Sequence, residues 1–105
     1  MAVFKSDLTE EDTDTLVRER VEPPKLYKVL MHNDDATPME FVVDILKSVF
    51  RKNDAEAVHL TMHIHSKGVG LCGIYTREIA EAKVVLVMRR AQQQRHPLTC
   101  TMEEE

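Results

Sequence analysis

The sequence predicts an α+β fold in which three helices pack on one face of a small antiparallel sheet of about three strands. Apolar residues follow strand patterns in three short segments and helical spacing in three longer ones. Their order is strand, helix, helix, strand, helix, strand, which is typical of a two-layer domain. Because 105 residues are enough for a single domain, we expect a core domain at residues 23–105, preceded by a disordered arm at 1–22.

The first strand is predicted at residues 26–32, LYKVLMH, which are rich in β-branched and aromatic side chains. Asn33, Asp34 and Asp35 follow it. Their short polar side chains bond readily to nearby backbone groups and favour a turn. A helix should then begin, since Thr37 can cap it and Glu40 can complete a capping box.

The later elements carry equally plain signals. Asn53 repeats the helix start, Gly68 ends that second helix, and LCGIYT at 71–76 predicts the second strand. Thr76 should cap the third helix, His96-Pro97 should stop it, and LTCTM at 98–102 predicts the last strand. The apolar stripe of the first helix is Met39, Val42, Val43, Leu46, Val49 and Phe50, and the residues expected inward in the third helix are Ile79, Ala80, Val84, Val87, Met88 and Ala91. In the second helix, the residues expected near one side are Ala57, Leu60, Thr61, Ile64 and His65.

Charge is distributed unevenly along the chain. Residues 1–22 carry seven acidic and three basic side chains, which accounts for the formal net charge of −4 of the whole chain. The arm is either a frayed terminus or a functional tail. Scattered basic residues argue against nucleic-acid binding, and no apolar run is long enough for a membrane span. With two distant cysteines and an acidic N-terminus, we expect a soluble, cytoplasmic monomer with reduced thiols.

The acidic turn admits several kinds of chemistry. By itself, Asn-Asp-Asp is good turn sequence before a capped helix. Consecutive carboxylates rarely aim at one substrate atom, and no Ser or Cys nucleophile accompanies them, so we do not expect an enzyme. A small metal-binding or hydrolytic protein that uses His32, Asp34, Asp35 and His65 remains an alternative, although we expect neither a metal nor another cofactor.

Three segments in fixed order resemble the ClpS family, the bacterial N-degron adaptors of the ClpAP protease. They are YKVLMHNDDATPMEFVVDIL, MHIHSKGVGLCGIYTREIAEAKV and HPLTCTMEEE, and the resemblance runs from about Pro23 to the end of the chain. It implies a non-enzymatic adaptor that binds proteins with an N-terminal Leu, Phe, Tyr or Trp and delivers them to the unfoldase ClpA.

The resemblance also implies roles for individual residues. Asn33, Asp34 and His65 would accept hydrogen bonds from the free N-terminal ammonium, which has three donors, with Asp35 supporting the turn. His65 must then be neutral at its accepting nitrogen. The residues that match the family's side-chain pocket are Thr37, Met39, Val42, Thr61, Ile64 and Leu98. The family usually has Met where this chain has Thr61.

Two further expectations concern the partner. The family docks on the N-terminal domain of ClpA through a charged patch on its third helix, which Glu78 and Lys83 match. From the residues alone, both would be an ordinary solvated helix face. The family's flexible arm, engaged by the unfoldase during delivery, corresponds to residues 1–22.

Overall fold

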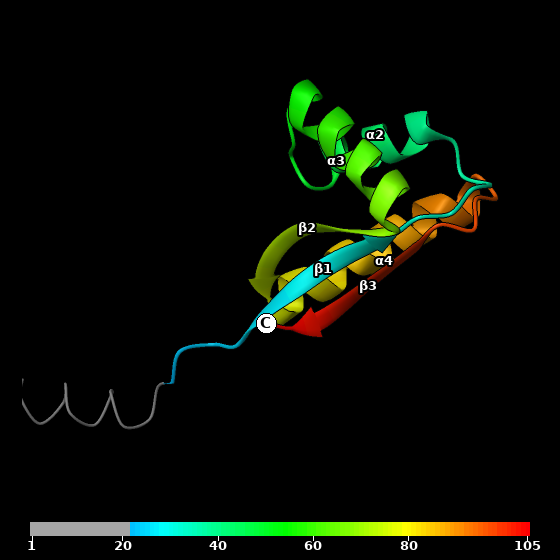
Figure 1. Ribbon diagram of the computed structural model, residues 1–105. Coiled ribbons are helices and arrows are strands. Elements are labelled where there is room, and N and C mark those ends of the chain that lie inside the picture. The colour runs from blue at the N-terminus through cyan, green and yellow to red at the C-terminus, as the bar shows by residue number, and fades with distance from the viewer. Residues whose placement is uncertain (1–21) are drawn as a thin grey trace, which may run out of the picture.

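The computed structural model describes residues 22–105 (Figure 1). The elements are β1 (Leu26–His32), α2 (Met39–Ser48), α3 (Asp54–Lys67), β2 (Val69–Thr76), α4 (Arg77–Gln93) and β3 (Thr99–Glu104). The predicted α+β class and the predicted order of elements are both confirmed. The arm predicted at residues 1–22 lies, apart from Glu22, outside the described residues.

The sheet has the strand order β2-β1-β3, with β1 antiparallel to both neighbours. At one end of β1, His32 lies opposite Val69 of β2 and Thr99 of β3. The register between β1 and β2 shifts after Val29, because Cys72 is an extra residue in β2 with no counterpart in β1. The central strand β1 therefore fixes the positions of its two neighbours, β2 and β3.

The helices cover one face of this sheet. Val29 and Met31 of β1 are completely buried, whereas the alternating Lys28, Leu30 and His32 remain partly exposed. Figure 1 shows α4 running along the length of the sheet, and α4 contacts all three strands. Helices α2 and α3 pack on each other, and α3 contacts β2. Together they form a second unit at the end of β1 where the chain enters the acidic turn.

The core follows the predicted stripes with a few differences. Ile45 is buried although it was not predicted to face inward, because it lies one turn before Val49 on the same side of α2. Met39, Ile79 and Met88 were expected inward, but their exposed fractions are 40%, 49% and 38%. Met39 stands in the first turn of α2. Ile79 and Met88 lie about 100° around α4 from the buried Ala80 and Val87, so they face away from the core.

Helix capping confirms one prediction and corrects another. Asn53 Oδ1 accepts from the Glu56 N–H at 2.8 Å, and Glu56 Oε1 accepts from the Asn53 N–H at 3.0 Å, so α3 begins with a complete capping box. The box predicted at Thr37 is wrong: Pro38 is the N-cap of α2 and makes no side-chain bond. The Thr37 hydroxyl instead donates to Asp34 Oδ2 at 2.8 Å. Thr76 is the N-cap of α4, without a side-chain bond.

Lys83 of α4 joins the helix layer across a long sequence distance. Its Nζ donates to the backbone oxygen of Val49 at 2.7 Å, at the C-terminal end of α2. The same ammonium lies 5.7 Å from the ring centroid of Phe50 and 5.1 Å from that of Tyr75. A cation is favourable at a helix C-terminus and over aromatic faces. Lys83 therefore ties the end of α2 to α4 and β2.

We expect Lys83→Met to lower the free energy of unfolding by roughly 1–2 kcal/mol, because the Val49 oxygen loses a charged donor and the two rings lose their cation. Chemical denaturation measures this change. Arg89→Met, at an exposed position on the same helix, is the control and should change stability by far less. Equal stabilities for the two variants would show that the Lys83 bonds contribute nothing to the fold.

Candidate functional site

A hollow of about 260 Å³ opens where the acidic turn, the start of α2, the end of α3 and the segment before β3 meet. The residues that line it are Asn33, Asp34, Asp35, Thr37, Pro38, Met39, Val42, Thr61, Ile64, His65 and Leu98. These residues are spread over 66 positions of the chain, from 33 to 98. Only the folded arrangement brings them together.

One backbone hydrogen bond sets the acidic turn against the end of α3. The Asn33 N–H donates to the carbonyl oxygen of Gly68 at 2.8 Å. Gly68 ends α3 with a φ of 91°, a left-handed conformation that glycine adopts without strain. His65 stands in the last turn of α3, so this bond places the turn beside its imidazole.

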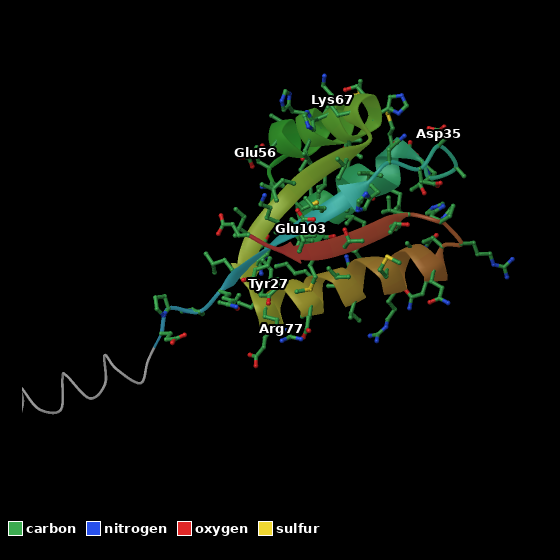
Figure 2. All side chains as sticks on the ribbon, turned by 60° about the horizontal axis from the view of Figure 1, so that its bottom comes forward. Tyr27, Asp35, Glu56, Lys67, Arg77 and Glu103 are labelled. Carbon is green, nitrogen blue, oxygen red and sulfur yellow. The ribbon has the colours of Figure 1, made fainter. Side chains whose placement is uncertain are left out.

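The mouth of the hollow is polar and carries negative charge. Thr37 Oγ1 donates to Asp34 Oδ2 at 2.8 Å, and Asn33 Nδ2 donates to Asp35 Oδ1 at 3.2 Å. Within residues 22–105, the Oδ1 atoms of Asn33 and Asp34 accept no hydrogen bond. Figure 2 shows Asp35 in this turn, at the opposite end of β1 from Tyr27. The mouth therefore offers acceptor oxygens and an imidazole to a cationic donor.

The floor of the hollow is apolar and tightly packed. Val42, Ile64 and Leu98 line it with exposed fractions of 7%, 2% and 2%, and all three belong to the hydrophobic core. Met39 stands at the rim, and its exposed side chain can cover a bound group. The shape is thus a polar mouth above an apolar floor, which suits a ligand with a cationic head and a hydrophobic side chain.

Two threonines are the buried polar residues of the hollow, with exposed fractions of 7% for Thr37 and 4% for Thr61. The hydroxyl of Thr37 is bonded to Asp34, as described above. The hydroxyl oxygen of Thr61 is buried and has no hydrogen-bond partner within the described residues. A buried polar group without a partner normally costs about 1–3 kcal/mol, so Thr61 requires an explanation.

All ten side chains predicted for the amine site, its support and the pocket line this one hollow. Pro38 was not predicted to do so. Its only signal in the sequence was its place between Thr37 and Met39, which were both predicted. The structure therefore brings the predicted residues together, while their roles in binding stay predictions.

His32, which belonged to the metal alternative, does not line the hollow. Its Nε2 lies 2.8 Å from Thr101 Oγ1, on the sheet face that the helices leave uncovered. In the described part of the chain, no three His, Cys, Asp or Glu side chains are grouped so that they could hold a metal ion. The geometry thus gives the metal alternative no support.

The two thiols lie in the core and not in the hollow. Burial raises the pKa of Cys72 to about 12, with a contribution from neighbouring Cys100, and burial also raises the pKa of Cys100 to about 12. Both groups therefore remain protonated at neutral pH, and a protonated thiol is a poor nucleophile.

The predicted partner patch lies on α4, apart from the hollow. Glu78 is exposed in the first turn of this helix, where a carboxylate is favourable in any case. Lys83 is half-buried, and its ammonium is bonded to Val49. The two residues thus differ in how freely they can contact another protein.

None of the helices formed by residues 22–105 has the length and apolarity that a membrane span requires.

Comparison with known proteins identifies the class of this fold and site. Residues 22–101 match the family model described as ATP-dependent Clp protease adaptor protein ClpS. Two relatives named ATP-dependent Clp protease adapter protein ClpS come from Nitratidesulfovibrio vulgaris and Parvibaculum lavamentivorans. The first is 52% identical over 89% of this chain and 93% of its own length, and the second is 54% identical over 87% and 83%.

A solved structure gives the same result. Agrobacterium tumefaciens ClpS2 bound to L-phenylalaninamide matches with a TM-score of 0.77 and 38% sequence identity, over 79% of this chain and all of that chain. The fold is therefore that of an adaptor of an ATP-dependent protease. The chain belongs to the ClpS family, as the sequence resemblance indicated.

Proposed function

We propose that this chain binds proteins through an unblocked N-terminal Leu, Phe, Tyr or Trp and delivers them to a ClpA-type unfoldase in the cytoplasm. The observation that carries the proposal is the hollow, which joins an acidic mouth to an apolar floor. An N-terminal residue of this kind has an ammonium next to a hydrophobic side chain, and both parts find matching surroundings there.

The mouth suits an ammonium in particular. An N-terminal ammonium has three N–H donors and no acceptor. Asn33 Oδ1, Asp34 Oδ1 and a ring nitrogen of His65 supply three acceptors beside the same hollow. A neutral His65 accepts, whereas a protonated one would repel the ligand.

The ligand of the Agrobacterium relative supports this assignment. L-phenylalaninamide combines a free amine with an aromatic side chain and has an amide in place of a free carboxylate. It therefore resembles the first residue of a protein more closely than free phenylalanine does. An analogous ligand would place its amine at the mouth and its ring against Val42, Ile64 and Leu98.

Asp34→Ala should weaken binding of a Leu-starting peptide at least about tenfold, because a desolvated ammonium loses a charge-assisted hydrogen bond. Fluorescence anisotropy measures the affinity, and Asp44→Ala, an exposed carboxylate of α2 outside the hollow, is the matched control. The wild type should also lose the peptide when its amine is acetylated. Binding that survives both changes, or that responds to a chelator, would contradict the amine site.

Deletion of residues 2–22 should leave the affinity for a Leu-starting peptide unchanged, because every residue that lines the hollow follows that segment. Degradation of a Leu-starting substrate by the unfoldase and its protease should stop. Both properties can be measured on one preparation of the truncated protein. Normal delivery by the truncated protein would show that the arm has no role in delivery.

Glu78→Ala should weaken docking on the N-terminal domain of the unfoldase and spare peptide binding, because Glu78 is exposed on α4, far from the hollow's lining. The double variant with Lys83→Ala should dock more weakly still. Calorimetry with the isolated domain measures docking, and a thermal melt of each variant separates docking from the loss of the Val49 bond. Normal docking by the double variant would count against this patch.

Thr61→Met should steepen the preference for an N-terminal Leu over Ile, because a longer, flexible side chain collides with β-branched first residues, whereas Thr is short and stiff. The wild type should accept Ile and Val more readily than the variant. Peptides that begin with Leu, Phe, Ile and Val, titrated against both proteins, measure this preference. An Ile-to-Leu affinity ratio that is identical in the two proteins would show that position 61 does not set this preference.

A further inference from the structure

Thr61 differs chemically from the other residues at the bottom of the hollow. Val42, Ile64 and Leu98 offer only hydrocarbon, and the hydroxyl of Thr37 is already bonded to Asp34. Thr61 has a hydroxyl that is buried and lacks a partner within residues 22–105. The wall of an otherwise apolar pocket therefore contains one unused hydrogen-bonding group.

The position of Thr61 relates it to the proposed amine site. Thr61 precedes His65 by four residues on α3, so both lie on the same side of the helix and about 6 Å apart along its axis. A first residue whose ammonium lies beside His65 must extend its side chain along this line toward the floor. The far end of a long side chain then lies near Thr61.

The hydroxyl can turn toward such a ligand at little cost. Threonine in a helix populates two χ1 rotamers, and rotation about the Cα–Cβ bond moves the hydroxyl to another position around that bond. No hydrogen bond to the described residues holds the hydroxyl in its present place. A ligand that bonds to the Thr61 hydroxyl therefore breaks no existing hydrogen bond to these residues.

We propose that Thr61 makes the pocket selective for tyrosine over phenylalanine as the first residue. A tyrosine hydroxyl can both donate and accept, as can that of threonine, and it stands at the far end of a ring that the apolar floor accommodates. Phenylalanine fills the same space but has no group that can bond to the Thr61 hydroxyl, which then stays without a partner. The inference rests on the proposed function, since it presumes that a first residue occupies the hollow.

The test measures the ratio of two affinities with peptides that differ only in their first residue. The wild type should bind a Tyr-starting peptide about three- to tenfold more tightly than its Phe-starting twin. A peptide that begins with 4-fluorophenylalanine, which fills the ring's far end without a hydroxyl, should bind like the Phe peptide. Equal affinity for Tyr and Phe would overturn the proposal.

Variants then assign the selectivity to one hydroxyl. Thr61→Val keeps the shape of the side chain and should abolish the Tyr-to-Phe ratio, whereas Thr61→Ser keeps the hydroxyl and should retain it. Thr99→Val, the same substitution at an exposed site on β3, should leave the ratio unchanged. A ratio that persists in Thr61→Val would overturn the role of Thr61.

Two outcomes separate this proposal from the function on which it rests. If the wild type binds Phe- and Leu-starting peptides but shows no preference for Tyr, only the role of Thr61 fails. If it binds none of the unblocked peptides, the proposed function fails and this inference with it. If Thr61→Val does not fold, the wild-type ratio and Thr61→Ser still decide the question.

Discussion

The site depends on one hydrogen bond, between the Asn33 N–H at the end of β1 and the Gly68 carbonyl at the end of α3. It closes the gap between two segments that are 35 residues apart in sequence, and it is possible because Gly68 adopts a positive φ. The strand beyond it runs so close to α3 that a Cβ on Gly70 would lie 2.5 Å from Ile64 Cγ1. Gly68 thus places the acidic turn beside the end of α3, and Gly70 lets β2 pack closely against the same helix.

Several side chains belong both to the hydrophobic core and to the proposed binding pocket. Val42, Ile64 and Leu98 belong to the core and also form the floor of the hollow. A substitution there changes the packing of the domain together with the shape of the pocket. The mouth is different, because Asn33, Asp35 and His65 are exposed and can be varied with less effect on stability. Under the proposed function, specificity for the first side chain would therefore be more constrained by the fold than recognition of the amine.

Much of this arrangement is predictable from the sequence, because it depends on local signals and on family motifs. Asn53 and Glu56 form the expected capping box, and the motif residues meet at one hollow. Features that depend on distant partners were not predictable. Thr37 was expected to cap α2, but Pro38 takes the N-cap position and the Thr37 hydroxyl donates to Asp34 instead. The bond of Lys83 to Val49 and the isolation of the Thr61 hydroxyl likewise follow from tertiary packing, which no local pattern reports.

The strand order β2-β1-β3 leaves β3 at an edge of the sheet, and its last residues are glutamates. An unpaired strand edge is a template on which a second chain can add a strand, and proteins often guard such edges with charge. In an antiparallel pairing of two β3 strands centred between Glu103 and Glu104, Glu103 of each copy would lie opposite Glu104 of the other. Such like-charge contacts are unfavourable. The acidic end of β3 therefore disfavours self-association by sheet extension at this edge of the sheet.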